Sequence, residues 1–236
     1  VPKDLLSSKK VWRVDPRSNR MEGSFYIEVS LHLLTDKAGL IEANKSRFAQ
    51  LSERLGNFEK AYVLATGPSV SNYAQFDYSN SLSIVCNSVI CDEALMDAVR
   101  PQILVFADPI FHFGPSQYAA AFRQHLRKAA EKYDFTIFIP FKYQAIFSST
   151  MPDLVNRMLA VPFVKERGFN FDLRADYEVR TTANILTLLL LPLAATFSNR
   201  VGIIGCDGRP LAENNYFWNH NQKTQINDKM ANIRKV

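Results

Sequence analysis

Residues 60–69, KAYVLATGPS, decide the fold class of this chain. Their first half is a mostly apolar run, typical of a strand that is buried on both faces of a parallel sheet. The run ends in a tight turn at Gly67, where the missing side chain lets a ligand approach the backbone closely. Two further apolar runs end in a similar way, at Asn87 and at Asp108. Because ligands bind beyond the carboxyl ends of parallel strands, these endings together predict a nucleotide site.

Strands and helices alternate along the rest of the chain. This rhythm predicts an α/β fold, a mostly parallel Rossmann-like sheet with helices on both faces. The less regular residues 141–177 are expected to form a lid or an insertion. Strands are expected at 60–65, 82–86, 102–107, 135–140 and 201–206, and helices at 88–100, 116–132, 181–197 and 224–235.

Two units are expected. Residues 1–58 would form an N-terminal helical extension, and residues 59–236 the α/β domain, which stops inside an apparent helix and is expected to be truncated there. The extension holds a long amphipathic helix over residues 35–55, because its apolar residues recur at helical spacing. Thr35 is the expected N-cap of this helix, and Gly56 is its expected C-cap.

The composition is that of an ordinary globular protein, with 47% hydrophobic and 22% charged residues. A net charge of +5 suits anionic substrates, but no basic run is interleaved with aromatic residues, so nucleic acid is not an expected partner. The apolar stretch at 185–195 is broken by Pro192 and is too short for a membrane span of about 20 residues. We therefore expect no membrane span and a cytoplasmic protein, for which peripheral contact with the inner membrane is an alternative.

The three cysteines, Cys86, Cys91 and Cys206, are an odd number and have neither CxxC nor His-paired spacing. Cys86 and Cys206 fall in apolar expected strands, where a thiol is usually a small buried hydrophobe. The pattern favours a reducing compartment and argues against a disulfide framework or a zinc site.

The turn residues Thr66, Gly67, Pro68 and Ser69 are the first candidate ligands of a nucleotide. Backbone N–H groups after Gly67 can face a phosphate or a ribose. Pro68 contributes no N–H, however, and the segment matches neither a P-loop nor the dinucleotide fingerprint GxGxxG. The alternative is an ordinary tight turn.

Asn87 and Asp108 carry side chains that can bond to ribose hydroxyls or to a base edge. The alternative for both is capping of a strand end, and Asp108, which precedes a proline, is especially typical of a turn. Asp207 follows a buried strand and can accept a hydrogen bond from a sugar hydroxyl, while Arg209 can meet a diphosphate or a carboxylate. A surface turn explains these last two residues almost equally well.

Thr181, Thr182 and Ala183 follow Arg180 at the expected start of the apolar helix. A helix N-terminus presents free N–H groups and a partial positive charge, which suits a phosphate. The alternative is that one threonine merely caps a core helix. Histidine side chains in general titrate near neutrality, so His220 is a candidate general base, although a lone histidine is more often structural.

Five short motifs, taken in order, resemble the bacterial sialyltransferases of glycosyltransferase family 42. They are TGPS (66–69), CN (86–87), FADP (106–109), RTTA (180–183) and GCD (205–207). The chain is also similar to the motility-accessory-factor-like glycosyltransferases. The resemblance runs from residue 60 to the end, and the order and spacing of the motifs carry it.

The resemblance implies an inverting glycosyltransferase that transfers sialic acid, or a related nonulosonic acid, from a CMP-activated donor to an acceptor hydroxyl. His220 would be the general base, and Arg209, Tyr216 and Thr182 would stabilise charge on the leaving phosphate. No metal cofactor is expected, since side chains support the leaving group in that family and the chain has no Asp-x-Asp motif. Nucleotide contacts are expected from Thr66, Gly67, Pro68, Ser69, Asn87, Asp108, Thr181, Thr182, Ala183 and Asp207.

Departures from the family pattern leave the donor open. Thr66 and Asp108 stand where the family has asparagines, and an ionised carboxylate cannot donate a hydrogen bond. A second hypothesis is a 6-hydroxymethylpterin pyrophosphokinase-like enzyme, which would use ATP and Mg²⁺ held by Asp108 and Asp207. A third is a catalytically inactive relative that binds nucleotide without transfer. The expected partners are a nucleotide sugar and a glycan or protein acceptor, and a homo-oligomer is compatible with the sequence.

Overall fold

Six parallel strands form the central sheet of the protein, in the order β5-β4-β3-β2-β1-β8. The computed structural model describes residues 31, 34–114, 116–165 and 168–208. The sheet confirms the expected α/β, Rossmann-like fold. Its strands are β1 (Lys60–Leu64), β2 (Ser81–Cys86), β3 (Ile103–Val105), β4 (Thr136–Pro140), β5 (Met158–Val161) and β8 (Val201–Ile204).

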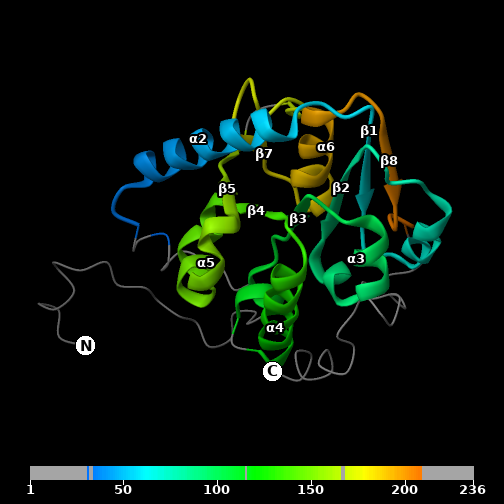
Figure 1. Cartoon of the computed structure of the whole chain (residues 1–236). Helices are drawn as coiled ribbons and strands as arrows, with labels where there is room; N and C mark the ends of the chain where they lie inside the picture. Colours follow the sequence, from blue (N-terminus) through cyan, green and yellow to red (C-terminus); the bar gives the residue numbers. More distant parts are fainter. Residues whose placement is uncertain (1–30, 32–33, 115, 166–167, 209–236) are drawn as a thin grey trace, which may run out of the picture.

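Helices cover both faces of this sheet, as the sequence predicts (Figure 1). Alternate residues of β1 point to opposite faces, because side chains in a strand have a period of two. Tyr62 and Leu64 join one hydrophobic cluster, and Ala61 and Val63 join the other. The first cluster includes residues of α3 (Glu93–Val99), α4 (Gln117–Lys132) and α5 (Gln144–Thr150), and the second those of α2 (Lys37–Leu55) and α6 (Leu191–Phe197).

The strand order reverses direction at β1. From β1 to β5 each new strand is added on the same side, and β8 then returns to pair with the other side of β1. Such a reversal is the topological switch point at which open α/β sheets bind their ligands. The carboxyl ends of β1 and β8 therefore flank the position that a ligand is expected to take.

Helix α2 packs directly on the sheet. Its Phe48 and Leu51 are almost fully buried, and the Phe48 ring makes edge contacts with Phe138 of β4 and Phe197 of α6. Asp36, rather than the expected Thr35, caps the helix, because the Asp36 side chain accepts a hydrogen bond from the Gly39 N–H at 2.8 Å. The division into 1–58 and 59–236 stays a prediction, and α2 shares its core with the α/β domain.

Asn44 ties α2 to the edge strand β5. Its buried Oδ1 accepts from the Ala160 N–H at 2.8 Å, and its Nδ2 donates to Gln144 Oε1 at 3.0 Å. We expect Asn44→Ala to lower the free energy of unfolding by about 2 kcal/mol, since it leaves the Ala160 N–H buried and unpaired. Urea denaturation measures this change. Ser46→Ala, at an exposed position of the same helix, is the control and should stay within about 0.5 kcal/mol; equal effects would contradict the role of Asn44.

Two sequence expectations are wrong in detail. Residues 141–177 are not simply a lid or an insertion, because they contain α5 and the sheet strand β5. The apolar helix does not begin near residue 181. Its first, wide turn is η7 (Leu186–Leu190), since β7 (Val179–Arg180) pairs with β6 (Phe163–Val164) and the Thr181 N–H donates to the Val164 carbonyl oxygen at 3.0 Å. That pairing holds the chain extended where a helix was expected.

The remaining expected elements are close to those observed, apart from the helix expected at 224–235, which lies outside the described residues. The helix expected at 88–100 is divided, because Asp92 caps a new helix, α3, after the 3-10 turn η3 (Asn87–Cys91). Cys206 lies beyond the end of β8 and is exposed, whereas Cys86 is buried as expected; all three cysteines are free. None of the helices in the described ranges has the length and apolarity needed to cross a membrane.

Candidate functional site

Four of the predicted positions line up along the carboxyl edge of the sheet. Asp108 follows β3, Asn87 follows β2, Gly67 follows β1 and Asp207 follows β8, and these four strands are neighbours in that order. Because all four strands are parallel, the four endings share one edge. Arg209, Tyr216 and His220 lie outside the described residues, so their predicted roles stay predictions.

The turns that follow β1 and β8 interlock. The Gly67 N–H donates to the Gly205 carbonyl oxygen at 2.8 Å, and the Gly205 N–H donates to Ser69 Oγ at 3.1 Å. The Ser69 N–H donates to Asp207 Oδ2 at 3.0 Å. A Cβ at Gly67 would overlap the Asp207 carboxylate and lie 2.6 Å from the Gly205 carbonyl oxygen, so only glycine permits this approach.

This interlock changes the role expected of the Gly67 turn. The N–H groups of Gly67 and Ser69, which the sequence offers to a phosphate, already donate to protein oxygens, and the Val70 N–H donates to the Gly67 carbonyl oxygen at 3.0 Å. Pro68 has no N–H. The Asp207 carboxylate therefore takes the place that an anion would need, and the turn orients this carboxylate.

The exposed carboxylate of Asp207 is held in one orientation, in which it can accept a further hydrogen bond. Its Oδ2 is held by the Ser69 N–H, while within the described residues its Oδ1 has no hydrogen-bond partner. A carboxylate oxygen fixed in this way suits the hydroxyl groups of a ribose or another sugar, which can donate hydrogen bonds to it.

Asn87 adopts a left-handed backbone conformation, with φ of 50°. Asparagine tolerates this conformation better than most residues, yet it still costs of the order of 1 kcal/mol relative to glycine. The side chain is half-buried, and in the part of the chain that the structure describes its amide has no hydrogen-bond partner. Strain together with an unused amide at a strand end is typical of a ligand-binding position.

Asp108 has the capping contacts that the sequence offered as its alternative role. Its Oδ1 accepts from the Phe111 N–H at 3.0 Å, and its own N–H donates to His112 Nδ1 at 3.0 Å. His112 is buried and packs on Phe106 and Phe122. Burial lowers the pKa of His112 to about 3, so the ring is neutral at physiological pH.

Thr181, Thr182 and Ala183 precede the helix instead of forming its first turn. The Thr182 hydroxyl donates to the Asn184 carbonyl oxygen at 3.1 Å, and Asn184 Oδ1 accepts from the Leu186 N–H at 2.8 Å. The following Ile185 and Leu186 pack against the same hydrophobic cluster as Ala65 and Ala107, which follow β1 and β3. The segment thus runs near the carboxyl edge, but part of its helix N-terminus is already capped by Asn184.

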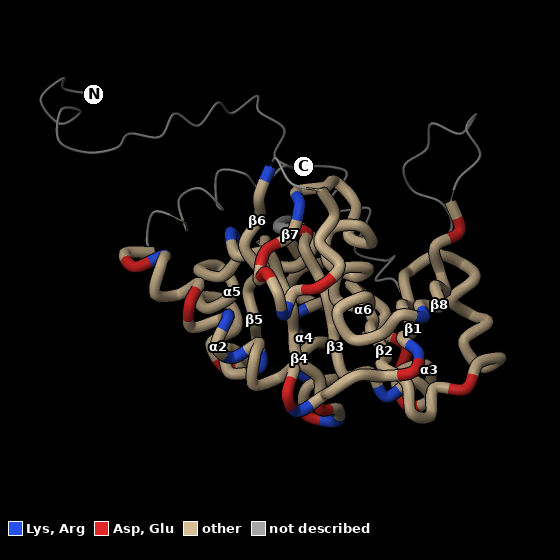
Figure 2. The backbone as a smooth tube through the Cα atoms, turned by 90° about the horizontal axis from the view of Figure 1, so that it is seen from above, with Lys and Arg blue, Asp and Glu red and all other residues tan. Residues whose placement is uncertain are grey.

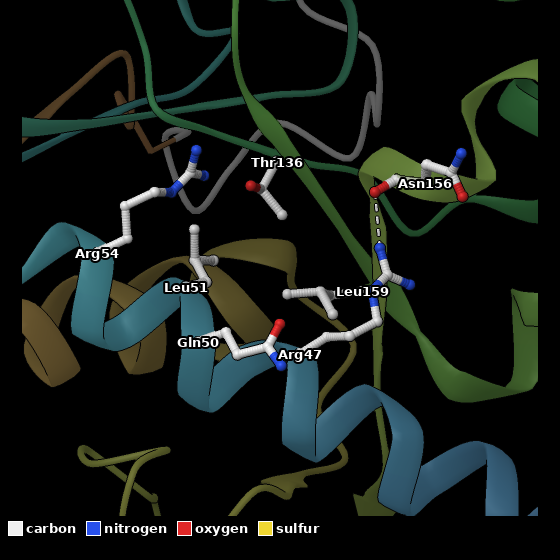
Figure 3. A pocket seen from close by; sticks show the side chains of 7 residues that line it. All are labelled: Arg47, Gln50, Leu51, Arg54, Thr136, Asn156 and Leu159. Carbon is white, nitrogen blue, oxygen red and sulfur yellow. Dashed lines mark hydrogen bonds between the residues drawn. The ribbon is translucent and has the colours of Figure 1, made fainter.

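Two cavities lie at the opposite, amino edge of the sheet. One, of about 280 Å³, lies between α2 and the start of β4, and its lining includes Arg47, Arg54 and Thr136 (Figure 3). The other, of about 500 Å³, is lined by Phe76 and Arg100 among others and lies near the starts of β2 and β3. No residue of the predicted nucleotide set lines either one. The only sequence signal for the first cavity is the pair of arginines two helical turns apart on α2.

Charges of both signs are distributed over the described residues (Figure 2). No group of three or more metal-ligating side chains is present among these residues. Comparison of the chain with protein-family models, with curated proteins and with solved structures found no match. Fold and site therefore define an α/β protein with a Rossmann-like parallel sheet whose switch point carries an oriented aspartate.

Proposed function

We propose that the protein is a glycosyltransferase that binds a nucleotide-activated sugar at the carboxyl ends of β1, β2 and β8. The observation that carries this proposal is the interlock of the Gly67 turn with Asp207 at the switch point. The order of the motifs, which resembles that of family 42 sialyltransferases, supports CMP-activated sialic or nonulosonic acid as the donor. The same proposal includes a bacterial surface glycan as the acceptor of the sugar.

In this proposal, Asp207 and Asn87 hold the nucleoside. Their strands are separated by β1, so their strand ends lie about 10 Å apart, a span comparable with a nucleoside. Asp207 Oδ1 accepts from a ribose hydroxyl, and the Asn87 amide, which both donates and accepts, bonds to a base edge. Thr181 and Thr182 lie on the phosphate side, near the start of the helix.

The chemical step would use residues beyond the described part. His220 removes the proton of the acceptor hydroxyl while the hydroxyl oxygen forms a bond to the anomeric carbon of the donor sugar. On the opposite face of that carbon, its bond to the phosphate oxygen breaks. Arg209 and Tyr216 stabilise the charge on the departing nucleoside monophosphate. The step inverts the anomeric centre and, as proposed, needs no metal ion.

The geometry argues against the pyrophosphokinase alternative. That reaction would need Asp108 and Asp207 to hold Mg²⁺ together, but β3 and β8 are three strand spacings apart, about 14 Å. A magnesium ion binds its oxygen ligands at about 2.1 Å, so one ion cannot reach both carboxylates. The Asp108 carboxylate is also engaged in the turn that follows β3.

A titration of the protein with CMP, UDP and GDP by calorimetry tests the proposal. We expect CMP to bind, and Asn87→Gly to weaken that binding about tenfold, the effect of losing one or two hydrogen bonds. Glycine accepts the left-handed backbone, so the variant should be no less stable than the parent. The effect on affinity is therefore separate from any effect on folding.

Asn80→Gly is the matched control for this experiment. Asn80 has φ of 56° and precedes β2 at the amino edge, so the substitution removes an asparagine from the same backbone conformation far from the site. Its CMP affinity should equal that of the parent. Absence of binding by all three nucleotides would remove the functional class, and equal losses in the two variants would remove Asn87 from the site. CMP binding without transfer from CMP-sialic acid would support the inactive relative.

A further inference from the structure

The pocket between α2 and β4–β5 is rich in hydrogen-bond donors and contains no carboxylate. Arg47, Gln50, Thr136 and Asn156 contribute polar side chains to its lining (Figure 3). Within the described residues, the side chains of Gln50, Thr136 and Asn156 have no hydrogen-bond partner. The side chains of Gln50 and Thr136 thus offer unused polar groups at the pocket, while Asn156 turns its backbone carbonyl oxygen toward Arg47 and its side-chain amide away (Figure 3).

Arg47 is the main charge of this pocket. Its side chain is half-buried, and its Nη2 donates to the Asn156 carbonyl oxygen at 2.7 Å, which fixes the orientation of the guanidinium group. In the described ranges it forms no ion pair with any carboxylate. A guanidinium presents its remaining N–H groups in a planar fork that matches an oxyanion, so a half-buried one without a counterion suits an anionic ligand.

Arg54 stands at the far end of the pocket and contributes less. Two helical turns of α2 separate it from Arg47, a distance of about 10 Å along the axis. Its contact with Asp134 is long, at 4.0 Å, and both side chains are mostly exposed, so this pair leaves Arg54 only weakly neutralised. Arg54 therefore adds positive potential to the pocket rather than a second fixed anion site.

The floor of the pocket is apolar. Leu51 of α2 and Leu159 of β5 lie between the two arginines and are 6% and 2% exposed (Figure 3). The volume of about 280 Å³ suits a small metabolite rather than a nucleotide sugar.

We propose that this pocket binds a small molecule that carries one oxyanion, a carboxylate or a phosphate, on a short apolar skeleton. The oxyanion bonds to the Arg47 guanidinium, the Thr136 side chain lies within the same pocket, and the skeleton packs on Leu51 and Leu159. This site lies at the amino edge of the sheet, so it is separate from the proposed nucleotide site and does not depend on it.

Hexanoate, butyl phosphate and inorganic phosphate are the probes, titrated by calorimetry at low ionic strength up to about 20 mM, above the millimolar Kd expected of a small monoanion. At least one of the two probes with an alkyl chain should bind at least about tenfold more tightly than inorganic phosphate, because its methylene groups leave water on the apolar floor. Whichever of the two binds more tightly identifies the oxyanion. Absence of binding by all three, or binding of inorganic phosphate alone, would overturn the proposal.

Gln50→Glu is the decisive variant. It places a negative charge at the pocket without changing side-chain size, and Gln50 is exposed, so folding should be unaffected. We expect at least a tenfold loss of affinity for the better probe, and a similar loss for Arg47→Lys, which keeps the charge but not the planar fork. Lys45→Gln is the control, because it removes one charge from an exposed position of the same helix outside the pocket. Equal losses in Gln50→Glu and Lys45→Gln would show only general charge attraction and would overturn the site.

Discussion

Replacing Gly205 with alanine should lower the free energy of unfolding by about 3 kcal/mol, the sum of backbone strain and overpacking. Gly205 has φ of 78°, a conformation that a side chain disfavours. An added Cβ would overlap the Ala65 carbonyl oxygen and lie 2.9 Å from its carbon and 3.0 Å from Val70 Cβ. The Ala65 oxygen and carbon are backbone atoms that follow β1, so removing the overlap would require β1 and β8 to move apart.

Urea denaturation measures the loss, and Gly56→Ala separates its two causes. Gly56 has φ of 68° at the end of α2, but a Cβ there would meet no atom within 4 Å. Its ψ of −147° places Gly56 in a backbone region that glycine almost alone adopts, so this control should cost about 1–3 kcal/mol from backbone strain alone. A Gly205→Ala variant no less stable than Gly56→Ala would mean that the turns after β1 and β8 are not tightly interlocked.

The second large effect is expected from His220→Ala, which should reduce sugar transfer by about 10²–10⁴-fold, as loss of a general base commonly does. The affinity for CMP should stay unchanged, because the imidazole acts on the acceptor and not on the nucleotide. Transfer is measured from CMP-sialic acid to an acceptor glycan, and CMP affinity by calorimetry in the same preparation.

His125→Ala is the control for this substitution. His125 is half-buried on α4, which packs on one face of the sheet and contributes nothing to the candidate site, so its loss should leave transfer unchanged. A His220→Ala variant with near-parental transfer would refute the assignment of the base. Loss of CMP binding together with transfer would instead assign His220 to the nucleotide site.

The polar strand endings were predictable because each is a local feature. A buried strand reads as an apolar run, and the residue that ends it is visible in the sequence at Gly67, Asn87 and Asp108. The role of each ending was not predictable. Asp108 and Asn87 are both small polar residues that follow an apolar run. In the structure, however, Asp108 accepts a hydrogen bond from the Phe111 N–H in a turn, whereas the Asn87 amide has no hydrogen-bond partner among the described residues. That difference depends on where the following chain turns.

The pocket at the amino edge and the strand β5 were not predicted from the sequence, for a related reason. Residues 158–161 are a short apolar run between irregular segments, and only the pairing with β4 and the bond from Ala160 to Asn44 make them a sheet strand. From the sequence alone, Arg47 and Arg54 are typical of a solvated helix face. In the structure, α2 packs on the sheet. Its packing then brings Arg47 to Asn156, more than 100 residues further along the chain.

By itself, the sequence determined the layered α/β class and the positions where strands end, because hydrophobic periodicity and turn residues act over a few neighbouring residues. Only the tertiary structure decided that β8 lies beside β1, so that the Gly67 turn orients Asp207 instead of leaving its N–H groups for a phosphate. Hydrogen bonds between residues about 140 positions apart depend on strand order, and strand order follows from how the helices pack on the two faces of the sheet.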